Sequence, residues 1–127
     1  MKRVLALILV LGTVAIAGAF AYRAAARDRS YRVLLASGEA ALAAGDTLAA
    51  IEDFSGAVAL RPDAMLARLR RGETYRTRGD FDVAARDFRA AAQLDPTATR
   101  PLEVLGDVLY EQERFKRAAE SNNPVNR

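Results

Sequence analysis

The chain has 127 residues, a formal net charge of +3, and neither cysteine nor histidine. The lack of both residue types excludes thiol nucleophiles, Ser-His-Asp relays and metal sites built from nitrogen or sulfur ligands. Residues 1–32 hold six basic residues against one acidic residue, whereas the remainder holds thirteen against fifteen, so no nucleic-acid-binding surface is predicted.

The first element is an uncharged stretch of nineteen residues, 4–22, that follows two basic residues. As a helix it reaches about 28 Å, close to the roughly 30 Å hydrocarbon core of a bilayer. We therefore predict a single membrane-spanning anchor within an N-terminal region, residues 1–30, that ends in a short basic link. A cleaved signal peptide is the alternative, because Ala17-Gly18-Ala19 has the form of a small-x-small cleavage site.

The charges that flank this stretch give two opposite predictions of orientation. The arginines after it favour a cytoplasmic C-terminal domain by the positive-inside rule. A short basic tail before the first apolar stretch is instead typical of a signal anchor, which carries the C-terminal domain across the membrane. We expect the second arrangement: a single pass through the inner membrane of a bacterium, with a periplasmic domain. The preference for Arg over Lys is a compositional sign of a bacterial source.

Residues 31–64 have the apolar spacing of two helices joined by a tight turn. The first stripe recurs at i, i+3, i+4 and i+7 and comprises Tyr31, Leu34, Leu35, Gly38, Ala41 and Leu42. Gly45 is predicted to end this helix and Asp46 to cap the next. The second stripe comprises Leu48, Ile51, Phe54 and Val58. Pro62 ends the second helix, and Asp63 is predicted to cap the third.

Residues 65–98 repeat this arrangement. The stripe of their first helix comprises Leu66, Leu69, Gly72 and Tyr75, and that of its partner comprises Phe81, Ala84, Phe88 and Ala91. Asp80 is predicted to cap the partner helix. The first helix also carries five arginines spread around its axis, for which we expect a solvated surface paired with nearby carboxylates: Arg68, Arg70, Arg71, Arg76 and Arg78.

An offset of 34 residues brings unlike residue types into register. The matched sets are Gly38 with Gly72 and Gly106, Gly45-Asp46 with Gly79-Asp80, Ala50 with Ala84 and Ala118, Phe54 with Phe88, Ala57 with Ala91, and Pro62 with Pro96. At these residues the chain resembles the tetratricopeptide repeat family. The resemblance implies an all-α fold, an α-solenoid of two full helical hairpins (31–64 and 65–98) and one truncated hairpin (99–121). Arg68 departs from the family pattern, which expects a large apolar residue there.

The third copy is incomplete. Phe115, Ala118 and Ala119 are predicted to begin a last helix, but Asn122 stands where the phenylalanine is due and Pro124 follows. The polar tail, residues 122–127, provides no capping helix. An array that ends in this way exposes an apolar face, so either it continues in a longer protein, which we favour, or a partner covers it.

In the family that the chain resembles, the first helix of each hairpin lines a concave groove that holds peptides. Residues at i, i+4 and i+7 share a helix face. The groove residues predicted in this way are Leu35, Glu39, Leu42, Leu69, Glu73, Arg76, Glu103, Asp107 and Tyr110. Three of them, Glu39, Glu73 and Asp107, share one register and favour a basic partner segment, with the leucines and Tyr110 taking apolar side chains. The alternative is a solvated surface that binds nothing.

These patterns predict a protein-binding scaffold without catalytic activity, cofactor, metal or small-molecule substrate. Paired acids such as Glu52-Asp53 point apart on a helix and do not converge on one pocket, as carboxylate chemistry requires. The alternative function is an assembly or oligomerisation module that uses the exposed end of the truncated array.

Overall fold

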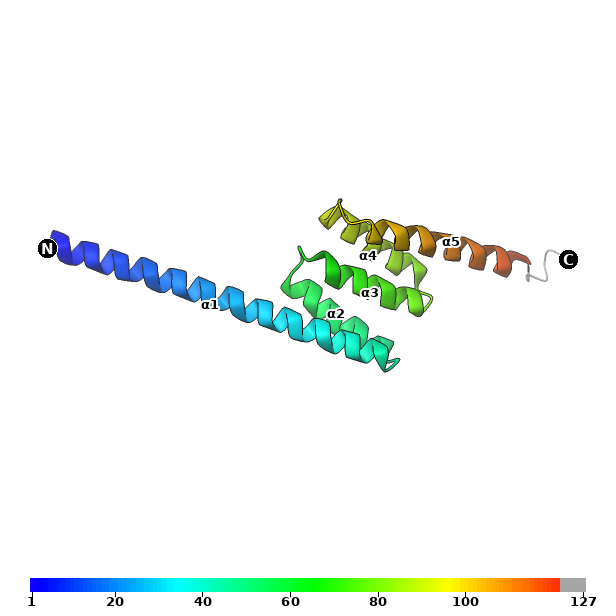
Figure 1. The fold of residues 1–127 in the computed structure, drawn as a ribbon, viewed down its shortest axis with the longest axis horizontal. Coiled ribbons are helices and arrows are strands. Elements are labelled where there is room, and N and C mark those ends of the chain that lie inside the picture. Colours follow the sequence, from blue (N-terminus) through cyan, green and yellow to red (C-terminus); the bar gives the residue numbers. More distant parts are fainter. Residues whose placement is uncertain (122–127) are drawn as a thin grey trace.

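Five helices make up residues 1–121, the part of the chain that this computed structural model describes (Figure 1). In chain order they are α1 (Lys2–Ala43), α2 (Thr47–Leu60), α3 (Met65–Thr77), α4 (Phe81–Leu94) and α5 (Arg100–Ser121). No strand occurs among these residues, so the all-α prediction is confirmed. The predicted polar tail, residues 122–127, lies outside the described residues.

The N-terminal half of α1 stands clear of all the other helices (Figure 1). Its side chains are exposed from the N-terminus to residue 27, although most of them are apolar. By length and composition α1 can cross a membrane, a property that a signal sequence shares. The long apolar N-terminal helix expected from residues 4–22 is therefore present.

The predicted basic link before residue 31 is not a separate connection, because α1 continues through it without a break. Residues 19–37 contain neither Gly nor Pro and are rich in Ala and Arg, which favour helix. The carboxylate of Asp28 pairs with Arg32 at 3.4 Å and with Arg61, in the loop after α2, at 3.0 Å. The Arg61 guanidinium also lies 5.1 Å from the centre of the Tyr31 ring. These contacts join α1 to the loop after α2.

Both hairpin turns form at the predicted glycines. Gly45 and Gly79 have φ angles of 79° and 83°, in the left-handed region that other residues rarely adopt. The Asp46 carboxylate accepts a hydrogen bond of 3.0 Å from the backbone N–H of Ala49. The first turn and its cap are therefore confirmed.

Of the two other predicted caps, the one at Asp63 is wrong and the one at Asp80 is correct in position only. Ala64, not Asp63, is the N-cap residue of α3, and it makes no side-chain hydrogen bond. Asp80 does occupy the N-cap position of α4, but its carboxylate pairs with Arg78 at 3.3 Å instead of accepting from the helix. An adjacent guanidinium competes with the backbone amides for the same oxygen atoms.

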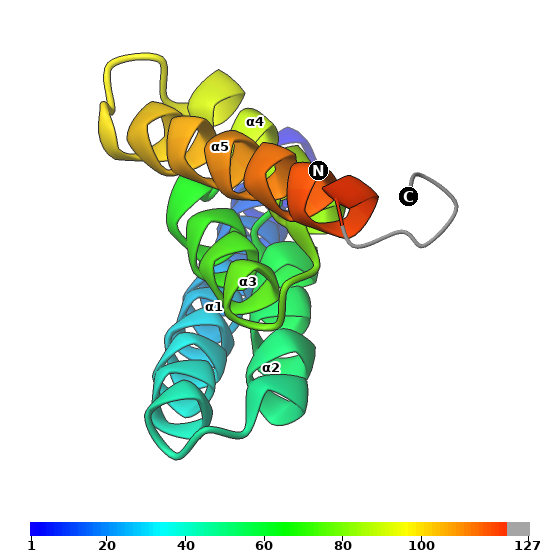
Figure 2. The same ribbon diagram turned by 90° about the vertical axis from the view of Figure 1, so that its right-hand side faces the viewer.

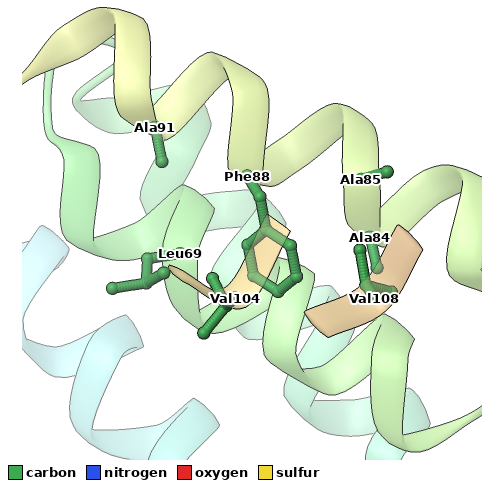
Figure 3. Packing of buried hydrophobic residues seen from close by; sticks show 7 residues of the cluster. All are labelled: Leu69, Ala84, Ala85, Phe88, Ala91, Val104 and Val108. Atoms are coloured by element: carbon green, nitrogen blue, oxygen red, sulfur yellow. The ribbon is translucent and has the colours of Figure 1, made fainter. Parts of the chain in front are cut away.

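The two full hairpins pack through the same glycine–phenylalanine contact. A Cβ atom added to Gly38 would lie 2.6 Å from the Phe54 ring, and one added to Gly72 would lie 2.7 Å from the Phe88 ring. Both rings are fully buried. Figure 3 shows the Phe88 ring on α4 directed into the space that it shares with Leu69 and with Val104 of α5. This contact explains why unlike residues recur together every 34 positions.

The hairpins stack one on another, and their axes turn along the stack. Figure 2 shows α1 and α2 side by side, with α5 crossing at the far end of the array at a wide angle to them. A stack of antiparallel helix pairs confirms the predicted solenoid. Two leucines of the predicted apolar stripes point outward instead: Leu48 and Leu66 are 68% and 44% exposed.

The last predicted helix does not form separately. α5 runs unbroken from Arg100 to Ser121 and includes Phe115 and Ala118. Its C-terminal half packs along the start of α4, where the Phe115 and Phe81 ring centres lie 5.3 Å apart. The third copy is thus one long helix within the described residues.

Candidate protein-binding surface

The predicted groove residues lie on α1, α3 and α5, the first helices of the three copies. We call the surface that carries them the groove face. Ion pairs connect the three helices along it. The Arg70 guanidinium of α3 lies between two carboxylates, 2.7 Å from Glu39 of α1 and 2.9 Å from Glu73 of its own helix. The hydrogen bond that Arg70 donates to the Glu73 carboxylate raises the pKa of Arg70. The two acids that were predicted to share a register therefore lie beside the same guanidinium group.

A second set of ion pairs joins α3 to α5. Arg76 donates two hydrogen bonds to Glu111, of 3.0 and 2.5 Å, and its guanidinium lies 3.6 Å from Asp107. These hydrogen bonds lower the pKa of Glu111 and raise that of Arg76. Arg100, at the start of α5, reaches Glu73 at 3.3 Å. The acidic residues of the groove face thus alternate with arginines.

Three members of this network, Arg70, Arg100 and Glu111, were not among the predicted site residues. A signal for part of it exists in the sequence. Glu39 and Arg70 are 31 positions apart, and so are Arg76 and Asp107. In both pairs a residue on the first helix of one copy faces an oppositely charged residue on the first helix of the next copy. The acid comes first in one pair and the arginine comes first in the other. An alignment of like residues 34 positions apart does not bring together opposite charges that are 31 positions apart.

The apolar members of the predicted set differ in accessibility. Leu35 and Leu42 are half-buried, and Tyr110 is 67% exposed with the Arg114 guanidinium 5.9 Å from its ring centre. Leu69 is only 6% exposed and packs in the core with Phe88, so its predicted contact with a ligand is wrong. Leu69 lies at the border of the groove face, where α5 covers its side chain. Glu103 is exposed on α5.

One arginine of α3 is half-buried rather than fully solvated, although it is paired with a carboxylate as predicted. Arg71 donates two hydrogen bonds of 2.7 Å to the Asp87 carboxylate of α4 and one of 3.2 Å to the Ser55 hydroxyl of α2. The Asp87 side chain is 7% exposed, and its hydrogen bonds raise the pKa of Arg71. Through these hydrogen bonds the Arg71 guanidinium links α4 of the second hairpin to α2 of the first hairpin. Asp53, which is 34 positions before Asp87, marks the same register in the first copy.

The family model described as tetratricopeptide repeat matches residues 35–99 and, in a second alignment, residues 69–123. The chain belongs to the tetratricopeptide repeat family. The two matches overlap and together cover more than half of its 127 residues, which confirms the resemblance found at the repeated glycines and phenylalanines. A search of curated proteins finds no match to the chain.

Tetratricopeptide repeats are protein–protein interaction modules, and the arrangement described above suits that role. The groove face carries charged side chains that ion pairs hold in place. Among residues 1–121, no three acidic side chains gather closely enough to hold a metal ion. The groove face of this tetratricopeptide repeat protein is a charged surface formed by three neighbouring helices.

Proposed function

We propose that this tetratricopeptide repeat protein is a membrane-anchored scaffold without catalytic activity that binds a basic peptide or protein segment along its groove face. The observation that carries the proposal is the composition of that face. Its predicted residues and their ion-pair partners include five carboxylates and three guanidiniums: Glu39, Glu73, Glu103, Asp107 and Glu111, with Arg70, Arg76 and Arg100.

The excess of carboxylates favours a basic segment over an acidic one. Asp107 and Glu39 are the most accessible of the paired acids, with side chains 61% and 43% exposed. A lysine or arginine from a ligand can approach them without displacing Arg70 or Arg76. Leu35, Leu42 and Tyr110 lie on the same face and supply apolar contact for the side chains between the charges.

The exposed apolar half of α1 supports the anchor. Apolar side chains that are exposed all around the N-terminal half of a helix are unfavourable in water and favourable in a bilayer. We place this helix in the inner membrane of a bacterium, with the repeats on the periplasmic side. The unbroken course of α1 then holds the groove face at a fixed distance from the bilayer.

Binding of a fluorescent peptide of alternating lysine and leucine to the full chain in detergent micelles tests the groove. The triple change Glu39→Gln, Glu73→Gln and Asp107→Asn is expected to weaken binding about tenfold, because each exposed ion pair contributes about 0.2–1 kcal/mol. A matched variant removes three carboxylates outside the groove face, by Glu52→Gln, Asp63→Asn and Glu120→Gln, and is expected to bind as the wild type does. Equal weakening in both variants would show that only net charge matters and would overturn the groove proposal.

A further inference from the structure

A pocket lies where α1 leaves the repeats, between this helix and the loop after α2. Seven residues line it, and we call it the junction pocket: Ala24, Arg27, Asp28, Leu60, Arg61, Pro62 and Asp63. Figure 1 shows this loop at the end of the stack from which the N-terminal half of α1 projects. The groove face includes none of these residues.

The junction pocket begins within one helical turn of the proposed membrane span. The uncharged stretch of α1 ends at Tyr22, a residue type that is enriched at the boundary between bilayer and water. Ala24 and Asp28 follow on the same unbroken helix, about 3 and 9 Å beyond Tyr22 at 1.5 Å per residue. The headgroup layer on each side of a bilayer is about 5–7 Å thick. The pocket therefore lies at the level of lipid head groups.

The loop side of the pocket is fixed to α1. Arg61 donates a hydrogen bond of 3.0 Å to the Asp28 carboxylate, and its guanidinium lies 5.1 Å from the centre of the Tyr31 ring. Asp28 also pairs with Arg32, at 3.4 Å. The charge of this carboxylate is thus offset by two guanidinium groups, so the wall that it forms is not a strong barrier to an anion.

The helix side of the pocket supplies a cation without a protein partner. Arg27 and Arg23 are exposed, and neither forms an ion pair with another of residues 1–121. They are four residues apart and share a face of α1, with Arg23 one turn nearer the span. Guanidinium groups bind phosphate oxygens through charged hydrogen bonds. This face therefore suits a phosphate group that reaches the pocket from the bilayer.

The surroundings of the pocket carry an excess of positive charge. Five arginines lie in or beside it against two carboxylates: Arg23, Arg27, Arg29, Arg32 and Arg61, with Asp28 and Asp63. The Asp63 side chain is 79% exposed and lies 4.0 Å from the Arg61 guanidinium, so its charge is hydrated and partly offset. Each basic residue close to a membrane surface strengthens the attraction of anionic lipids about fivefold. The excess thus favours an anionic lipid over a zwitterionic one.

We propose that the junction pocket binds the head group of an anionic phospholipid, whose phosphate lies between Arg27 and Arg61. The apolar residues of the pocket, Ala24, Leu60 and Pro62, contact the glycerol and the first carbons of the acyl chains. The bound lipid joins α1 to the loop after α2 and fixes the orientation of the repeats on the membrane surface. This inference rests on the proposed membrane anchor, because the anchor brings the pocket to the bilayer.

The probe is a bilayer of equal parts phosphatidylglycerol and phosphatidylcholine with the same acyl chains. The full chain is reconstituted into nanodiscs of this composition, and native mass spectrometry counts the lipids that stay bound when the protein is released. The wild type is expected to retain phosphatidylglycerol at least fivefold more often than phosphatidylcholine. Arg27→Gln is expected to lower this preference about fivefold, because it removes one charge and its hydrogen bonds to the phosphate.

Arg29→Gln is the matched control. Arg29 is equally exposed, forms no ion pair among residues 1–121 and lies at nearly the same depth. It is two residues from Arg27, so it lies on nearly the opposite side of α1 and away from the pocket. This variant is expected to keep the lipid preference of the wild type. Circular dichroism is expected to show that both variants fold, because neither side chain is part of the core.

Nanodiscs of phosphatidylcholine alone test the anchor separately. A chain that does not enter them contradicts the anchor and, with it, the lipid site. A chain that enters but retains the two lipids equally overturns the lipid site alone. Equal losses in Arg27→Gln and Arg29→Gln also overturn it, because surface charge alone then attracts the lipid. Inorganic phosphate that the wild type retains in phosphatidylcholine nanodiscs and Arg27→Gln does not would assign the pocket to a free anion, which overturns the lipid site as well.

Discussion

Single residues set the distance between helices in this protein. At Gly38 and Gly72 the absence of a side chain lets an aromatic ring lie directly on the backbone of the facing helix. A glycine in the middle of a helix costs about 1 kcal/mol relative to alanine. The full burial of Phe54 and Phe88 offsets that cost, since a buried aromatic ring contributes roughly 1.5–3 kcal/mol.

The same substitution at two glycines is expected to have opposite effects. Gly72→Ala places a methyl group 2.7 Å from the buried Phe88 ring and 3.2 Å from the Asp87 Cβ, so we expect a loss of about 1–2 kcal/mol in the free energy of unfolding. Gly106→Ala meets no atom and is expected to raise that free energy by up to about 1 kcal/mol through helix propensity. Urea denaturation followed by circular dichroism measures both. A stabilised Gly72→Ala variant would show that the Phe88 ring is free to move.

The hydrogen-bonded ion pair between half-buried Arg71 and buried Asp87 is expected to be strongly coupled. Asp87→Ala leaves the Arg71 guanidinium without its main partner in a largely buried place, at an expected cost of about 2–4 kcal/mol. Adding Arg71→Met to that variant removes the unpaired charge and is expected to restore much of the stability. A double-mutant cycle by urea denaturation measures the coupling. Additive effects of the two changes would contradict this coupling.

At the scale of elements, α1 combines two roles in one helix. Its N-terminal half is exposed and apolar, while its C-terminal part forms half of the first hairpin. Propensity explains the continuity, because no helix-breaking residue separates the two parts. The contacts of Asp28 and Tyr31 with Arg61 then determine the direction in which the exposed half leaves the repeats.

The proposed anchor predicts that α1 keeps the protein in membranes through an alkaline carbonate wash. Leu7→Arg with Leu11→Arg is expected to release the protein into the soluble fraction, because each arginine at the centre of a span costs about 2.5–3.5 kcal/mol. Val33→Arg with Leu48→Arg changes two residues that are equally exposed, 61% and 68%, but lie outside the span, and is expected to stay bound. The intact mass of the membrane fraction reports cleavage, and a mass that lacks the first residues would contradict an uncleaved anchor.

At the scale of the whole molecule, the stack is held by contacts between neighbouring helices, as expected for a repeat array. Within residues 1–121 the third copy consists of one helix, so the described part of this copy is attached through fewer neighbours. Val104 and Val108 pack on Phe88, and the bonds from Arg76 to Glu111 fasten the outer side.

This attachment is expected to weaken in acid. The hydrogen bonds from Arg76 lower the pKa of Glu111 in the folded state, so the pair stabilises the fold above the pKa of an unfolded glutamate. That stability is lost as the pH falls through the lowered pKa. Glu111→Gln is expected to be less stable than the wild type at pH 7, and the two urea midpoints are expected to converge toward pH 3. A difference that stays constant over this range would mean that the charge of Glu111 plays no part.

The helices, their turns and the repeat were predictable from the sequence because they depend on local properties. Apolar spacing and the left-handed turns at Gly45 and Gly79 depend on residues that are close in the sequence. The pairing of Gly72 with Phe88 recurs at a fixed offset and is visible there too. The cap at Asp63 was predicted wrongly because the N-cap position of α3 lies one residue later, at Ala64. Asp80 occupies its predicted position, but its carboxylate pairs with the nearby Arg78 instead of accepting from α4. The groove register correctly predicted that Glu39 and Glu73 lie on the same face. It did not predict that Arg70 lies between them.

The sequence by itself therefore determined the kind of protein: helical hairpins of the tetratricopeptide repeat family behind a long apolar helix. Only the tertiary structure decided which charges meet and that Leu69 and Asp87 turn inward. The reason is that a helix repeats its own geometry from residue to residue, whereas contacts between helices depend on the angle and distance at which the hairpins pack. That packing is set by all the buried side chains together.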